Sequence, residues 1–176
     1  MTSPEAAPSP VPEAVRQAVG QFVTGIAVVA ATTGGVTHAL AVSSFISVSL
    51  DPLLVLVCVD RAAHRHDPVV SAATWAVSIL SEEHEPTARR LTPGGAPLDA
   101  ELNGHPHHPG PVTGHPILAD ALAWLECRTY AVHPGGDHTI LIGQVLSAAG
   151  PQPSEASGVP GPLLFHAGRY RRLPTP

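Results

Sequence analysis

The chain has 176 residues, of which 44% are hydrophobic and only 13% charged, and its formal net charge is −5. This length and composition predict one globular domain with its own core. The mild acidity excludes the strongly basic surface of a nucleic-acid-binding protein. Lysine is absent, which excludes Schiff-base catalysis by lysine and a phosphate-loop NTPase.

Three further patterns bear on where the protein is located and on the state of its two cysteines. No run of 18 apolar residues is present, so no membrane-spanning helix is expected. Residues 1–11 are rich in Pro, Ala and Ser and lack the basic and apolar regions of a signal peptide; they are interpreted as a disordered leader, and a cytoplasmic location is expected. Cys58 and Cys127 each lie in an apolar run and are expected to be small buried side chains.

Strands dominate the expected secondary structure. Apolar and β-branched segments predict strands at residues 26–32, 36–42, 53–59, 75–80, 121–132, 138–148 and 163–170. Gly34-Gly35 and the turn at 134–137 indicate hairpins. The run 53–59 is continuously apolar, which is typical of a strand buried on both faces.

Three short helices are expected, at 12–20, 68–73 and 81–91, with Ser81 as the N-cap of the third. The Gly-, Pro- and His-rich segment 92–116 is expected to be an irregular loop. Hairpins outnumber crossover connections, which favours an antiparallel barrel over a parallel sheet.

A run of hydroxyl side chains is the first candidate for chemistry. Ser43, Ser44, Ser47 and Ser49 fall within seven residues, beside an apolar strand. Hydroxyls and free backbone N–H groups can bind a phosphate or the polar edge of a cofactor ring. The alternative is a strand whose solvent-facing side happens to carry serine.

Two further clusters follow strands. Arg61, His64, Arg65 and His66 form a basic cluster directly after the buried run 53–59, and arginine suits bidentate contacts to phosphate. A plain solvated loop is the alternative. In the turn at 135–139, an Asp precedes a His and can orient its ring; ordinary turn chemistry explains the same residues.

Several other sites are not indicated. No Gly-x-Ser-x-Gly elbow and no Gly-x-Gly-x-x-Gly fingerprint is present. His105, His107, His108 and His115 are close in sequence, but no nearby cysteine completes a zinc pattern. A metal site is therefore not expected.

The ordered set of segments resembles one known family. The segments that carry the resemblance are 21–29, 41–52, 54–61, 75–81, 125–127, 136–139, 143–145 and 162–170. Together they resemble the flavin reductase-like family, the small NAD(P)H:flavin oxidoreductase components of two-component flavin monooxygenases. The resemblance covers residues 12–172, interpreted as one domain with a short tail at 173–176.

The resemblance implies a mainly β fold, a split β-barrel of the FMN-binding type with Greek-key connections and two or three short helices, which works as a homodimer. It implies FMN or FAD as cofactor, NAD(P)H as co-substrate, and a partner monooxygenase that receives the reduced flavin. Neither nucleic acid nor a membrane is an expected partner.

The resemblance also assigns residues to the flavin. Ala41, Val42, Ser43 and Ser44 are expected along the isoalloxazine ring, largely through backbone groups. Ser47 is expected near the ribityl chain or the phosphate.

A second group is assigned to the phosphate and the nicotinamide. Asp60, Arg61 and His66 are expected in the loop around the phosphate end. His138 is expected where the nicotinamide stacks on the flavin, and Arg169 is expected to close that region. Both are the predicted catalytic residues, since hydride transfer needs positioning rather than a nucleophile.

One departure from the family pattern keeps alternatives open. Ala62, Ala63 and Arg65 stand where the family usually has Ser and Thr after the basic residue. A repurposed member, such as a flavin-dependent oxidase or a cyclase of bacterial secondary metabolism, is the first alternative. A non-catalytic flavin- or haem-binding module is the second.

Overall fold

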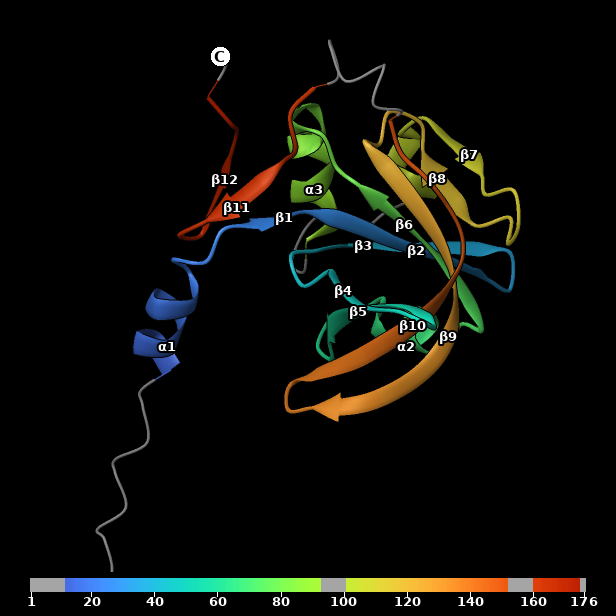
Figure 1. Ribbon diagram of the computed structural model, residues 1–176, viewed down its shortest axis with the longest axis horizontal. Coiled ribbons are helices and arrows are strands. Elements are labelled where there is room, and N and C mark those ends of the chain that lie inside the picture. The colour runs from blue at the N-terminus through green and yellow to red at the C-terminus, as the bar shows by residue number, and fades with distance from the viewer. Residues whose placement is uncertain (1–11, 93–100, 152–159, 175–176) are drawn as a thin grey trace, which may run out of the picture.

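Three antiparallel hairpins build most of a curved seven-stranded sheet, and Figure 1 shows β9 and β10 bending across β2 and β3. The computed structural model describes residues 12–92, 101–151 and 160–174. The sheet order is β3-β2-β6-β9-β10-β5-β4. Its strands are β2 (Ala27–Thr33), β3 (Val36–Val42), β4 (Ile46–Leu50), β5 (Leu53–Asp60), β6 (Thr74–Ile79), β9 (Ala123–Gly135) and β10 (His138–Ala149).

Smaller elements flank this sheet. A second sheet joins β1 (Thr24–Gly25), β11 (Leu164–His166) and β12 (Arg169–Arg171), and a two-stranded sheet joins β7 (His107–Pro109) and β8 (Pro116–Leu118). The helices are α1 (Pro12–Val19), α2 (His66–Val70) and α3 (Glu85–Leu91), with 3-10 turns η1 (Glu82–His84) and η2 (Glu101–Gly104). None of the helices in the described residues is long and apolar enough to cross a membrane. The expected mainly β class with short helices is confirmed.

The sheet separates two apolar cores. Val29, Val57 and Trp75 belong to the core on the side of α2, whereas Val28, Leu80 and Leu118 belong to the core beneath α3 and β8. β2 therefore buries both of its faces, because its alternate residues enter different cores. The same alternation explains its run of small and β-branched side chains.

The prediction that residues 53–59 are buried on both faces is wrong for the single chain. Val55, Val57 and Val59 are buried in the core, but Leu54 and Leu56 between them stay partly exposed. The described residues supply a core on only one side of this strand, so its other apolar face is left uncovered.

Three sequence predictions need correction at element level. Segment 81–91 divides into η1 and α3, although Ser81 is confirmed as an N-cap. The predicted single strand 163–170 is a hairpin of β11 and β12, which turns at Ala167 and Gly168 with φ of 48° and 75°. Within 92–116, of which 93–100 lie outside the described residues, η2, β7 and β8 replace the expected irregular loop.

Glu126 explains why the β7–β8 hairpin forms. Its fully buried carboxylate accepts hydrogen bonds from Val112 N (3.0 Å) and Thr113 N (2.6 Å), and from Thr113 Oγ1 (2.6 Å). These bonds satisfy backbone N–H groups in the turn of the hairpin, where few such groups have a backbone acceptor. Because Glu126 belongs to a different strand, no local pattern in 92–116 could indicate this arrangement.

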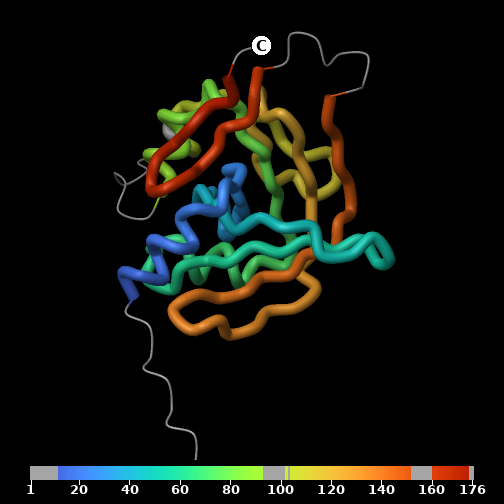
Figure 2. Tube along the Cα trace, turned by 60° about the vertical axis from the view of Figure 1, so that its left-hand side comes forward, coloured from blue at the N-terminus to red at the C-terminus, as the bar shows by residue number. Residues whose placement is uncertain are grey.

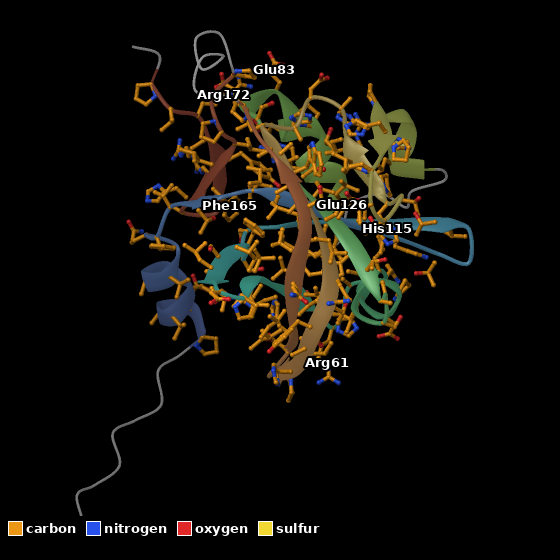
Figure 3. All side chains as sticks on the ribbon, turned by 45° about the vertical axis from the view of Figure 1, so that its right-hand side comes forward. Arg61, Glu83, His115, Glu126, Phe165 and Arg172 are labelled. Carbon is orange, nitrogen blue, oxygen red and sulfur yellow. The ribbon has the colours of Figure 1, made fainter. Side chains whose placement is uncertain are left out.

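A buried histidine attaches the same hairpin to the main sheet. Nδ1 of His115 accepts a hydrogen bond from Thr32 N (3.0 Å), so the ring proton lies on Nε2, 2.8 Å from Thr74 Oγ1. Figure 3 shows His115 close to Glu126. Burial lowers the pKa of His115, although the Thr74 hydrogen bond and the Glu126 charge both raise it. Burial also lowers the pKa of His84 and of His105.

The free energy of unfolding is therefore expected to decrease as the pH falls below about 6.5, the ordinary histidine pKa. Below that pH the unfolded chain binds protons that the folded chain, with its lowered pKa values, does not bind, so stability rises with pH and is complete above it. Urea unfolding at pH about 7.5 and about 5.5 measures the difference. His115→Gln, which keeps a polar group between Thr32 and Thr74, should reduce it; an unreduced difference would show that His115 is not one of the titrating groups.

Candidate active site

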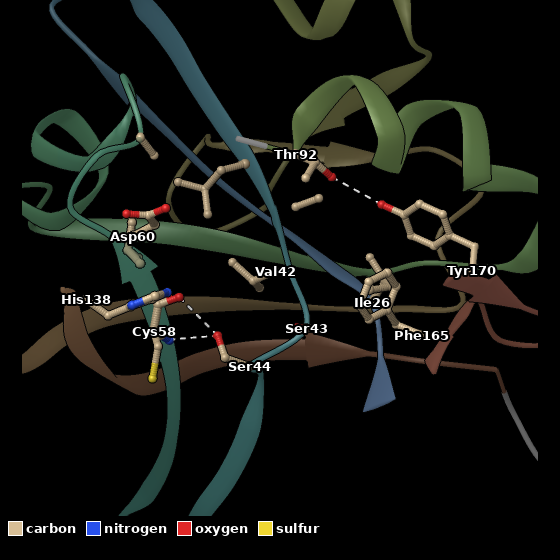
Figure 4. A pocket seen from close by; sticks show the side chains of 14 residues that line it. Ile26, Val42, Ser43, Ser44, Cys58, Asp60, Thr92, His138, Phe165 and Tyr170 are labelled. Atoms are coloured by element: carbon tan, nitrogen blue, oxygen red, sulfur yellow. Dashed lines mark hydrogen bonds between the residues drawn. The ribbon is translucent and has the colours of Figure 1, made fainter. Parts of the chain in front are cut away.

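A cavity of about 250 Å³ lies between the end of β3 and the end of β5, and the β11–β12 hairpin borders it on the far side. Figure 4 shows a polar end with Asp60 and His138, and an apolar end with Ile26, Phe165 and Tyr170. The lining residues are Ile26, Leu40, Ala41, Val42, Ser43, Ser44, Cys58, Val59, Asp60, Ala63, Thr92, His138, Phe165 and Tyr170. A cavity with a polar and an apolar end suits a flat, amphipathic ligand.

Ser44 gives the middle of the cavity its shape. Its Oγ accepts a hydrogen bond from Cys58 N (2.9 Å) and donates one to Cys58 O (3.1 Å). The hydroxyl thereby substitutes for a strand ladder, since in the described residues none joins β3 to β5. Because this hydroxyl is engaged with β5, Ser44 offers a ligand mainly its backbone groups.

Asp60 and His138 are brought together by strand register. They are partners across the β5–β10 ladder, so two residues that are far apart in sequence lie side by side at the cavity. Asp60 Oδ1 also accepts a hydrogen bond from Ala62 N (2.8 Å). This bond shapes the loop that leaves the strand, as an Asx turn does.

The turn before His138 holds its ring. Gly136 has φ of 73°, a conformation that glycine adopts without strain, and Asp137 O accepts a hydrogen bond from Arg61 N (3.0 Å). Asp137 Oδ1 lies 2.7 Å from His138 Nδ1. The hydrogen bond from His138, together with its charge when it is protonated, lowers the pKa of Asp137. His138 itself lines the cavity.

Six of the ten predicted site residues line the cavity, namely Ala41, Val42, Ser43, Ser44, Asp60 and His138. The other four are placed elsewhere in the single chain. Ser47, Arg61 and Arg169 are exposed, and Figure 3 shows Arg61 near the tip of the β9–β10 hairpin, far from Phe165. His66 is engaged at both nitrogens, by Asp67 Oδ1 and Thr139 Oγ1, each at 2.7 Å.

The apolar end of the cavity was missed in the sequence. Thr92, Phe165 and Tyr170 come from the end of α3 and from the β11–β12 hairpin. Phe165 and Tyr170 lie within segment 162–170, which carries part of the family resemblance, and that match was the one signal that pointed to them. Their meeting with Thr92 depends on packing between distant segments.

The histidines of segment 92–116 have structural partners. His105 Nδ1 lies 3.0 Å from Thr87 Oγ1, and His107 Nδ1 lies 2.8 Å from His105 O. His108 Nδ1 lies 3.2 Å from Pro109 O, and His115 bridges two strands as described above. Across residues 12–92, 101–151 and 160–174, no group of three or more His, Cys, Asp or Glu is arranged to hold a metal ion.

Comparison with known proteins now decides the family. The profile described as "Flavin reductase like domain" matches residues 19–174. The chain belongs to the flavin reductase-like family. The FMN reductase (NADH) SmoA of Agrobacterium fabrum is 38% identical to this flavin reductase-like chain over 161 residues, which are 90% of this chain and 84% of SmoA. An NADH-dependent FAD reductase of Streptomyces globisporus is 36% identical over 161 residues, with the same coverage of 90% and 84%.

A solved structure resembles the flavin reductase-like chain over most of its length. The NADH:FAD oxidoreductase SgcE6 of Streptomyces globisporus C-1027, in complex with NAD and FAD fragments, has a TM-score of 0.80 and 33% sequence identity, and the match covers 91% of each chain. The expected family is therefore confirmed, and its predicted fold is confirmed as mainly β.

Proposed function

We propose that this chain uses NADH or NADPH to reduce free FMN or FAD and supplies the reduced flavin to a partner monooxygenase. The observation that carries the proposal is that Ala41–Ser44, Asp60 and His138 line one cavity. Named relatives in the family are NADH-dependent flavin reductases. Relatives are also named as reductase subunits of flavin-dependent monooxygenases.

The residues of the cavity fit a flavin. The isoalloxazine ring has a polar edge that needs hydrogen-bond partners, and the backbone of Ser43 and Ser44 lies in the middle of the cavity wall. When both are bound, the nicotinamide supplies a hydride and the flavin accepts it, so the protein needs no nucleophile of its own. The task of the protein is to hold the two rings stacked, with His138 beside them and its tautomer set by Asp137.

The test is an assay of NADH and NADPH oxidation with and without added FMN or FAD. The expected result is turnover that added flavin stimulates by about tenfold or more. If neither flavin stimulates turnover with either nicotinamide, the proposed reductase function is wrong. Flavin binding without such turnover would favour the alternative of a repurposed oxidase or cyclase, which Ala62 and Ala63, lacking hydroxyls in the phosphate loop, keep open.

A split β-barrel that works as a homodimer is part of the same proposal. The cavity, at about 250 Å³, is smaller than typical ligand pockets of about 300–1,000 Å³, so a second chain can complete it. The uncovered face of β5 supports this. Leu54 and Leu56 are only partly buried, Ile46 beside Leu56 is 55% exposed, and Leu50 at the end of the β4–β5 hairpin is 82% exposed.

Helix α1 and the residues after it carry further exposed apolar side chains. Val19 and the following Phe22 are 65% and 75% exposed, and Figures 1 and 2 show α1 standing to one side of the main sheet. Exposed apolar side chains of this kind are typical of an interface between subunits.

Ile46→Glu is expected to convert the homodimer into a monomer, because a carboxylate on each uncovered face would be buried without a partner. Sedimentation or light scattering coupled to gel filtration measures the mass. Val36→Glu is the matched control, since Val36 is 57% exposed at the tip of the β2–β3 hairpin and should leave the mass unchanged. A dimer that survives Ile46→Glu would contradict an interface on this face.

The cytoplasmic location belongs to the proposal as well. Cys58 and Cys127 are both free thiols in the structure, as is usual for proteins kept in a reducing compartment. For Cys127, burial and the neighbouring Glu126 charge raise the pKa to about 12, so this thiol is inert toward the proposed chemistry.

A further inference from the structure

The apolar end of the cavity is an aromatic wall, which consists of Phe165 and Tyr170. Their ring centroids are 5.4 Å apart and the planes meet at 68°, an edge-to-face arrangement. Both rings line the cavity together with Ile26, opposite Asp60 and His138 (Figure 4). None of the residues assigned by the sequence resemblance explains this wall.

The hydroxyl of Tyr170 is already engaged. Thr92 Oγ1 donates to Ala88 O (2.8 Å) and lies 3.2 Å from the Tyr170 hydroxyl. Since a hydroxyl carries one proton, Thr92 Oγ1 must accept in the second bond and Tyr170 must donate. The Tyr170 proton is therefore already taken up by Thr92, and the ring offers the cavity its carbon surface.

One face of the Tyr170 ring is covered. The guanidinium carbon of Arg89 lies 4.8 Å from the ring centroid, in the range of a cation–π contact. Arg89 Nε and Nη2 donate to Glu85 Oε1 at 3.0 and 2.7 Å, which holds the guanidinium in place. Tyr170 is thus held by α3 from two sides.

The hairpin that carries the wall is anchored independently. Phe165 pairs with Thr24 in the β1–β11 ladder, and Ala167 N at the turn donates to Gly20 O (2.8 Å). Main-chain bonds therefore hold the strand that carries Phe165, and side-chain contacts with Arg89 and Thr92 hold the ring of Tyr170. A wall with so many restraints is preformed, and a preformed surface loses little conformational entropy on binding.

We propose that this aromatic wall binds the dimethylbenzene end of the isoalloxazine ring, with Tyr170 as the main determinant of ring affinity. The inference rests on the proposed flavin reductase function and adds an orientation to it. The dimethylbenzene end is the one part of the flavin that makes no hydrogen bonds, and the wall is the part of the cavity that offers none. The ribityl chain and phosphate then extend toward Asp60 and the loop that follows it.

The test compares riboflavin, FMN and FAD, which share the ring and differ only beyond it. Tyr170→Ala is expected to raise the Kd about tenfold for all three alike, as measured by quenching of flavin fluorescence, because the lost contact is with the ring. Tyr170→Phe keeps the ring and should change each Kd by less than about threefold. Tyr170→Leu, which retains apolar volume beneath Arg89, replaces the alanine variant if that variant does not fold.

Two results would overturn the inference. Unchanged affinity for all three flavins would show that the wall does not contact the ring. A loss confined to FMN and FAD, or a higher KM for NADH with unchanged flavin Kd, would assign the wall to the phosphate or to the nicotinamide. Failure of the wild-type chain to bind any flavin would instead refute the proposed function itself.

Discussion

Gly143→Ala is expected to lower the free energy of unfolding by about 3 kcal/mol, the largest stability effect of any single methyl group we consider. A Cβ atom at Gly143 would overlap the Cζ2 atom of Trp75 and would lie 2.9 Å from Cys127 Cβ. Trp75 is completely buried. Its Nε1 donates to Thr129 Oγ1 (3.2 Å), whose hydroxyl donates to Ala72 O (2.7 Å), so the indole cannot turn aside without breaking this chain of bonds.

Urea unfolding with the denaturant slope held common to both proteins measures the loss. Gly150→Ala is the matched control just after the same strand, since its Cβ would meet only Ala123 Cβ at 3.4 Å, an ordinary contact. The control should change stability by less than about 1 kcal/mol. Equal midpoints for Gly143→Ala and the wild type would show that the core on the α2 side can expand around Trp75.

His138→Ala is expected to lower the turnover number of NADH-dependent flavin reduction by about tenfold or more, with a much smaller change in flavin affinity. The ring lines the cavity beside Asp60 and is oriented by Asp137. A residue that positions the nicotinamide contributes to the hydride-transfer step rather than to binding of the flavin, so kcat should fall while the flavin Kd is preserved. Steady-state kinetics and flavin titration together separate the two quantities.

His133→Ala is the matched control for this variant. His133 lies on β9, opposite Ile140 in the same hairpin, and is exposed, so its removal should leave both kcat and the flavin Kd unchanged. A His138→Ala enzyme with wild-type turnover would remove His138 from the reaction. Loss of flavin affinity equal to the loss of kcat would make it a flavin-binding residue instead.

Local patterns in the sequence were sufficient for two of the hairpins, β2–β3 and β9–β10. Gly34 and Gly35 both have positive φ in the turn between β2 and β3, the conformation that such a glycine pair predicts. Likewise, the turn before His138 was expected from its two glycines and Asp137. Information about these features lies within a few consecutive residues, which is why they could be predicted.

Features that depend on distant contacts could not be predicted in this way. The hydroxyl of Ser44 bonds to both backbone groups of Cys58, 14 residues further along the chain, and no pattern near Ser44 indicated that partner. The β7–β8 hairpin depends on Glu126, and the aromatic wall depends on Thr92 meeting Tyr170. In each case a side chain forms a hydrogen bond with a group in a distant segment. The residues around either partner do not indicate that bond.

Strand β5 contributes both to the cavity and to the uncovered face. Cys58, Val59 and Asp60 line the cavity, and Leu54 and Leu56 lie on the uncovered face. If two chains associate through that face, cofactor affinity and self-association become linked quantities. Thermodynamic reciprocity then requires that saturation with flavin tighten the pairing of subunits by the same factor by which pairing tightens flavin binding. Dilution of the enzyme would accordingly weaken its hold on the cofactor, a coupling that operates through one shared strand.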